Sequence, residues 1–202
     1  LRRLGTTAMP ARSGPVVLLD VDGTLTDTNY LHTLAWRRAF LDRGHDVGSW
    51  RIHKLIGASA TRLMTELIGA PDDAVKASWR RHFDRLVPEI RAFPGATELL
   101  EEVRRRGGRP VLATSSPGDL LEHHLRALGA SSDDFDAVTT DSDVSEAKPS
   151  PEVFLTALDE AGGRVTEAVV LGDTGWDVDS ASAAGLPTIG VCSGGWTRDE
   201  LV

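Results

Sequence analysis

The sequence predicts an α/β fold: a Rossmann-like parallel sheet of about five strands, flanked by helices and interrupted by an inserted helical cap. Three observations support this. Short apolar runs lack the alternation of half-exposed strands, which is typical of strands buried on both faces of a parallel sheet. Segments with helical periodicity separate most of these runs. One long stretch after the first run has helical patterns only.

Five apolar runs predict the strands. The first ends at Asp20, the second at Thr114 and the fourth at Gly172 and Asp173. Strands that alternate with helices indicate a parallel sheet with helices on both faces. The predicted strands cover residues 16–19, 110–113, 137–139, 168–171 and 188–191.

Apolar residues at helical spacing predict the helices of this core. Glycine follows each periodic segment, and glycine just past a helix is a common stop signal. The expected core helices cover residues 96–103, 120–128, 153–158 and 178–184.

The helical stretch after the first strand predicts the cap. Roughly 90 residues separate the first two strands, far more than one crossover helix needs. Three helices are expected there, over residues 31–38, 63–68 and 75–83, the second capped by Ser59. The predicted division is core 14–27, cap 28–93 and core 94–202, preceded by a loose tail over residues 1–13 without the apolar region of a signal peptide.

Composition narrows the class of protein. The single cysteine, Cys192, allows no intrachain disulfide, so a cytoplasmic location is favoured. Cys192 itself is expected to be a small buried residue. The net charge of −8 disfavours nucleic acid as a partner. No apolar run approaches the roughly 18–20 residues of a membrane helix, so no membrane partner is expected.

Acidic and hydroxyl residues follow the predicted strands. In such sheets ligands bind beyond the carboxyl ends of the strands. Asp20, Asp22 and Asp173 would repel one another there unless a cation lay among them. Oxygen ligands without a histidine or cysteine cluster suit Mg²⁺. With the Thr114 hydroxyl and the charge of Lys148, this set suits phosphoryl transfer.

These segments resemble, in order, the four motifs of the haloacid dehalogenase (HAD) superfamily. The first is Asp20-Val21-Asp22-Gly23-Thr24-Leu25, and the insert after it is similar to a helical "C1" cap. The resemblance spans residues 16–191. The other motifs are Thr114 after Val111-Leu112-Ala113, Lys148 in Ala147-Lys148-Pro149, and Gly172-Asp173-Thr174-Gly175-Trp176-Asp177.

The resemblance implies a role for each motif residue. Asp20 would be the phosphate-accepting nucleophile, and Asp22 would protonate the leaving oxygen and then deprotonate water. Asp20, Asp173 and the backbone carbonyl of Asp22 would hold Mg²⁺. Thr114 would bind the transferring oxygens, and Lys148 would offset charge. Asp177 would orient Lys148 or a metal-bound water, while Gly23, Thr24 and Ser115 would support the substrate and the catalytic groups.

The stretch from Thr28 to His32 resembles that of β-phosphoglucomutases, in which a histidine at the position of His32 bonds the acid/base aspartate. The arginine of the mutase cap loop is not reproduced in Gly57-Ala58-Ser59-Ala60, although Arg62 lies two residues on. A phosphatase is therefore favoured, with a phosphomutase as the alternative. A phospho-aspartate switch module is a third hypothesis, although receiver domains lack a cap and place their acidic pair before the nucleophile.

The expected substrate is a small phosphorylated metabolite. Phosphoglycolate, a sugar phosphate and a nucleotide monophosphate all stay open, as do the cap residues that set specificity, the oligomeric state and whether the termini are native. His123 and His124 are neighbours on one helix and point in different directions, so a structural role is expected for both. Gly194 and Gly195 are expected in a loop near the site.

Overall fold

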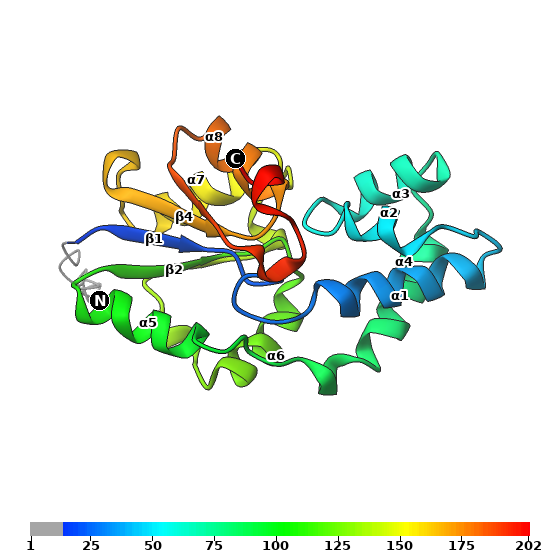
Figure 1. The fold of residues 1–202 in the computed structure, drawn as a ribbon, viewed down its shortest axis with the longest axis horizontal. Coiled ribbons are helices and arrows are strands. Elements are labelled where there is room, and N and C mark those ends of the chain that lie inside the picture. The colour runs from blue at the N-terminus through cyan, green and yellow to red at the C-terminus, as the bar shows by residue number, and fades with distance from the viewer. Residues whose placement is uncertain (1–13) are drawn as a thin grey trace, which may run out of the picture.

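The computed structural model describes residues 14–202, so the expected tail over residues 1–13 lies outside the described part of the chain. The sheet forms one lobe and a group of helices forms the other (Figure 1). Within residues 14–202 the sheet has five parallel strands in the order β3-β2-β1-β4-β5, which confirms the predicted fold class. The strands are β1 (Val16–Leu19), β2 (Arg109–Ala113), β3 (Val138–Thr139), β4 (Ala168–Gly172) and β5 (Thr188–Gly190).

Strand β1 is at the centre of the sheet. Val16 pairs with Arg109 of β2 on one side and with Ala168 of β4 on the other. The parallel register brings the carboxyl ends of these three strands to the same edge, where Asp20, Thr114 and Asp173 follow them. The topology therefore gathers residues that are far apart in the sequence.

Helices cover both faces of the sheet. One apolar cluster joins Leu18 to Phe154 and Ala181 on one face, and another joins Leu19 to Leu100 on the opposite face. Because both faces are buried, the strands need apolar residues at successive positions, which explains the unalternated runs. The helices are α5 (Ala96–Arg105), α6 (Gly118–Leu128), α7 (Glu152–Glu160) and α8 (Gly175–Ala183).

Within the insert over residues 28–93 the structure has four α-helices, one more than the sequence predicted there. The additional helix, α2, has only five residues, too few for a periodic signal. Ser59 caps α3 as expected, because its Oγ accepts a hydrogen bond of 3.1 Å from the Arg62 amide. The four are α1 (Asn29–Asp42), α2 (Ser49–His53), α3 (Ala60–Ile68) and α4 (Asp73–Asp84).

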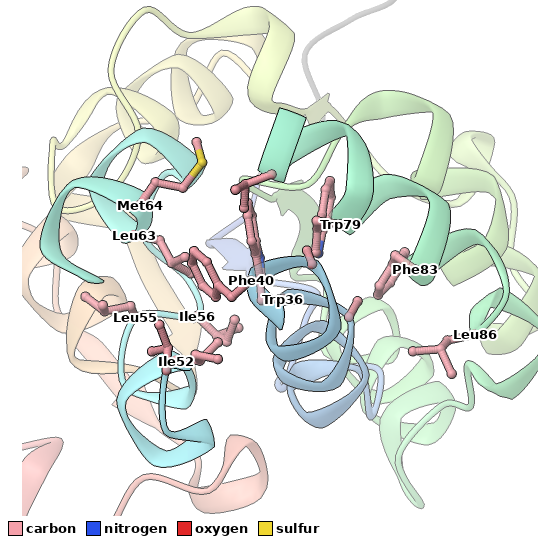
Figure 2. Packing of buried hydrophobic residues seen from close by; sticks show 14 of the residues in the cluster. Trp36, Phe40, Ile52, Leu55, Ile56, Leu63, Met64, Trp79, Phe83 and Leu86 are labelled. Carbon is pink, nitrogen blue, oxygen red and sulfur yellow. The ribbon is translucent and has the colours of Figure 1, made fainter. Parts of the chain in front are cut away.

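These four helices share their own aromatic core (Figure 2). The rings of Trp36 and Trp79 stack with centroids 5.1 Å apart, and Phe83 packs beside Trp79 at 5.7 Å. Phe40 and Phe83 are fully buried. Burial of such rings provides most of the stability of a small helical unit, so α1 and α4 form a firm support above the sheet edge.

The chain leaves the sheet through a run of short turns. Cys192 lies in one of them, just past the edge strand β5, and is exposed. The expectation of a buried cysteine is therefore wrong, because only one neighbouring strand and little packing cover this edge. Among the described residues no helix is long and apolar enough to cross a membrane. The 3₁₀ segments are Val87–Glu89, Ser132–Asp134, Asp141–Asp143, Val165–Glu167, Cys192–Gly194 and Arg198–Glu200.

Candidate active site

A cavity of about 980 Å³ lies between the sheet edge and the helical lobe. Its core side includes Asp20, Asp22 and Asp173, each just past a strand or in the loop that follows it. His32 of α1 and Trp79 of α4 line the opposite side. The four predicted motifs thus meet at one cavity, roofed by the helices of the insert.

Lys148 joins two carboxylates at the bottom of this cavity. Its Nζ lies 2.5 Å from Asp20 Oδ1 and 2.7 Å from Asp177 Oδ1, and the residue is only 2% exposed. Burial by itself lowers the pKa of Lys148, but Asp177 and Asp20 more than reverse this and hold it above its ordinary value. Lys148 is therefore a permanent buried cation beside Asp20.

Asp177 is held in place from its other side as well. It is the N3 residue of α8, where its Oδ2 accepts hydrogen bonds from the amide and the hydroxyl of Thr174 at 3.0 and 2.6 Å. This capping box stabilises the start of the helix and also orients Asp177. Its Oδ1 is then directed to Lys148, the first of the two roles that the sequence suggested for it.

Carboxylate oxygens of Asp20, Asp173 and Asp177 lie within 4.8 Å of one another. Burial, and then the neighbouring carboxylates, raise the pKa of Asp173 to about 9. Burial also raises the pKa of Asp20 to about 7, despite the opposing charge of Lys148. Ionising both groups requires further positive charge between them. The all-oxygen donor set therefore fits a hard divalent cation such as Mg²⁺.

Polar groups and two glycines surround Asp173. Thr24 Oγ1 lies 3.0 Å from its Oδ1 and 3.3 Å from Asp20 Oδ2, so this hydroxyl bridges the two acids. Asn29 Nδ2 donates to Asp173 Oδ2 at 2.7 Å and to the Gly194 carbonyl at 3.2 Å. A Cβ at Gly23 or Gly194 would overlap Asp173 Oδ2. The loop at Gly194 thus lies beside the site, as the sequence suggested, and both positions require glycine.

Asp22 has a different surrounding from Asp20. Its Oδ1 accepts from Thr28 Oγ1 at 2.5 Å and lies 3.1 Å from His32 Nε2, while its Oδ2 accepts from the Ser116 hydroxyl. Burial by itself raises the pKa of Asp22, but His124, His32 and these hydrogen bonds hold it well below its usual range. Without a bound ligand Asp22 is therefore held as a carboxylate, and Lys148 contacts Asp20 and Asp177 instead.

The loop after β2 presents Ser115 and Ser116 to the cavity. Ser115 Oγ is buried without a hydrogen-bond partner among the described residues, which leaves it free for a ligand oxygen. Thr114 is buried one position earlier, and its Oγ1 accepts from the Ser116 amide at 3.0 Å. Through this hydrogen bond Thr114 shapes the loop that carries the two serines.

Four residues of the site were not selected from the sequence as site residues. Ser116 adjoins Ser115, and Thr28 and Asn29 fall in the stretch that resembles the mutases, so adjacency was an available signal for three of them. His124, for which a structural role was expected, lies 3.7 Å from Asp22. No local pattern signals this contact, because it depends on how α6 packs under the loop after β1.

The parallel sheet, the helical insert and the acidic cavity between them are the features of an α/β enzyme with an inserted cap. The family model of the haloacid dehalogenase-like hydrolases matches residues 15–185. The chain belongs to this family, as its motifs suggested.

Relatives named as phosphatases specify the class of enzyme. The chain is 29% identical to validoxylamine A 7'-phosphate phosphatase of Streptomyces hygroscopicus subsp. limoneus, over 87% of this chain and 84% of the relative. It is 28% identical to phosphoglycolate phosphatase of Rhodospirillum rubrum, over 92% and 82%. A hydrolase structure from Pseudomonas syringae superposes with a TM-score of 0.87 at 32% identity, covering 93% and 88%. The chain is therefore a phosphatase of the HAD family.

Proposed function

We propose that the chain is a Mg²⁺-dependent phosphohydrolase of small phosphorylated metabolites that works through an aspartyl-phosphate on Asp20. The observation that carries this is the position of Asp20 at the cavity, paired with buried Lys148 and beside Asp173. A carboxylate nucleophile next to a fixed cation and a cation site has the parts that phosphoryl transfer requires.

The residues divide the work in two steps. In the first, an oxygen of Asp20 forms a bond to phosphorus and the bond from phosphorus to the leaving oxygen breaks. Asp22, which takes up a proton when the negative phosphoryl group lies beside it, gives that proton to the leaving oxygen. In the second, Asp22 takes a proton from a water whose oxygen attacks phosphorus, and the bond to Asp20 breaks. Lys148 offsets charge on Asp20 throughout.

Asp20, Asp173 and the backbone carbonyl of Asp22 would hold Mg²⁺, which, when bound, supplies positive charge to the phosphoryl oxygens. Thr24 and Asn29 orient the two side-chain ligands, since their hydrogen bonds already fix the carboxylates in the protein. Ser115 offers its free hydroxyl to a phosphoryl oxygen.

The contacts of the Arg62 side chain favour a phosphatase over a phosphomutase. A mutase must bind a second phosphate, and Arg62 is a cavity-lining cation of the cap that could do so. Its Nε donates to Glu66 Oε1 at 2.8 Å, and its guanidinium lies 4.6 Å from the centre of the Trp176 ring. Arg62 is therefore already engaged, within the cap and with the core.

The relatives and the composition support the substrate class and setting. The two relatives are named for validoxylamine A 7'-phosphate and phosphoglycolate, both small phosphorylated compounds. The net charge of −8 fits a small anion that is bound locally better than it fits nucleic acid. We infer a cytoplasmic location from the single cysteine, since no disulfide is required.

The first experiment is phosphate release from a panel of phosphorylated metabolites, with Mg²⁺ and with EDTA, beside an Asp20→Asn protein purified identically. Release that requires Mg²⁺ and is lost in the variant is the expected result. Equal release by the variant would overturn the assignment of the nucleophile. Conversion of β-glucose 1-phosphate without phosphate release would indicate a mutase, and a stable phosphoprotein by intact mass without turnover would indicate a switch.

A further inference from the structure

His124 of α6 is a fully buried histidine that the two-step scheme does not use. Its Nδ1 lies 2.9 Å from Thr26 Oγ1, and its Nε2 lies 3.7 Å from Asp22 Oδ1. Among the described residues Nε2 has no hydrogen-bond partner. An unpaired buried polar atom costs about 1–3 kcal/mol, so a purely packing role would be better served by leucine, the residue type at the neighbouring buried positions Leu121 and Leu125.

The position of the His124 ring is fixed by its surroundings. Burial lowers its pKa, which the nearby Asp22 only partly opposes, and the histidines His32 of α1 and His123 of α6 add to the lowering. The contact of this ring with Asp22 depends on where the ring lies and not on its charge.

Thr26 fixes the position of the His124 ring. Its hydroxyl lies 2.9 Å from Nδ1 and 3.2 Å from the Val21 carbonyl, which belongs to the loop that carries Asp22. With Nδ1 held there, Nε2 faces Asp22 Oδ1. The other described partners of this carboxylate, Thr28, Ser116 and His32, contact it from the loop after β1, the loop after β2 and α1. His124 therefore borders Asp22 from α6, which none of these partners does.

We propose that His124 is a positioning residue for Asp22, anchored by Thr26 on one side and orienting the acid/base carboxyl group toward the leaving oxygen on the other. This inference rests on the proposed function, because it assigns His124 to the proton transfer that Asp22 performs. A third group that orients an acid or base is a common arrangement in enzymes.

The test compares two matched probes, phenyl phosphate and 4-nitrophenyl phosphate, in single turnovers with Mg²⁺. Phenolate is the poorer leaving group and depends more on a proton from Asp22. With His124→Leu, release of phenol is expected to fall about 10–100-fold, and release of 4-nitrophenol less than about 3-fold. His124→Gln, whose amide reaches toward the place of Nε2, is expected to recover part of the loss.

His123→Leu is the matched control, because His123 is the neighbouring, partly exposed histidine of the same helix. It is expected to leave both rates within about 2-fold of the unmodified protein. Equal losses on both probes in His124→Leu, without recovery in His124→Gln, would reduce His124 to a packing residue and overturn the proposal. If His124→Leu does not fold, the same ratio measured in His124→Gln decides. Absence of Mg²⁺-dependent phosphate release from the metabolite panel would instead overturn the proposed function.

Discussion

Two neighbouring parts of the cavity shift the pKa values of their carboxyl groups in opposite directions. Around Asp20 and Asp173, burial outweighs the available donors, and both pKa values are raised. Around Asp22, two residues along the chain, histidines and hydroxyls outweigh the same burial, and the pKa is lowered. The first part needs an added cation before both of its carboxyl groups can ionise, whereas the second part already stabilises its carboxylate. One loop thereby carries a cation-dependent nucleophile next to a carboxylate that needs no metal charge.

The largest expected effect comes from the nucleophile. Asp20→Asn removes the attacking oxygen and a metal charge while nearly conserving volume, so turnover should fall by at least about 10³-fold. Phosphate release measures this, and a thermal melt in EDTA checks that the fold is intact. Turnover above a tenth of the normal rate in a preparation free of other phosphatases would contradict the assignment.

A smaller loss of turnover is expected when Asp22, in the second part of the cavity, is replaced. Asp22→Asn removes the acid and base but no metal-binding side chain, so turnover should fall by about 10²–10⁴-fold. Mg²⁺ affinity should stay close to normal, which calorimetry measures. A large loss of Mg²⁺ binding in this variant would show that the two parts of the site are not separate.

The buried cation holds the first part together in the absence of metal. Lys148→Met leaves Asp20 and Asp177 buried without their partner, and breaking such a pair costs about 3–5 kcal/mol. Urea unfolding in EDTA measures the free energy of unfolding. Lys54→Met is a suitable control, because its pair with Glu200 is well exposed and such pairs contribute at most about 1 kcal/mol. Equal effects of the two substitutions would contradict this account.

The smallest expected effect is a dependence of stability on pH. The pKa of Asp173 is about 9 in the folded protein, above its ordinary value. The folded state therefore binds more protons than the unfolded state between these values, and this contribution to stability falls as pH rises. In EDTA the melting temperature should drop between about pH 6 and pH 8.5, and Mg²⁺ should raise it more at the higher pH. A Mg²⁺-induced shift that is smaller at about pH 8.5 than at about pH 6 would count against this.

Much of the architecture was predictable because its signals are local. Continuous apolar runs and glycine stops predicted the five strands and the core helices within a few residues. The order of the motifs then indicated which strand ends would meet. Helix α2 escaped prediction because five residues carry no period.

The fine structure of the site was less accessible, for a physical reason. His124 and His123 are adjacent and chemically identical, yet one is fully buried 3.7 Å from Asp22 and the other is partly exposed. Only the rotation of α6 against the loop after β1 distinguishes them. Ser116 and Asn29 likewise obtain their roles from partners on other elements. Hydrogen bonds between distant segments leave no periodic trace in a sequence.

The bond from Asn29 to the Gly194 carbonyl has a consequence for how the protein is made. It joins positions 165 residues apart, and Gly194 lies directly against Asp173. During synthesis the nucleophile leaves the ribosome well before the loop at Gly194. A nascent chain that stops short of Gly194 therefore cannot close the pocket around Asp173, and the cation site is completed only after that loop has emerged.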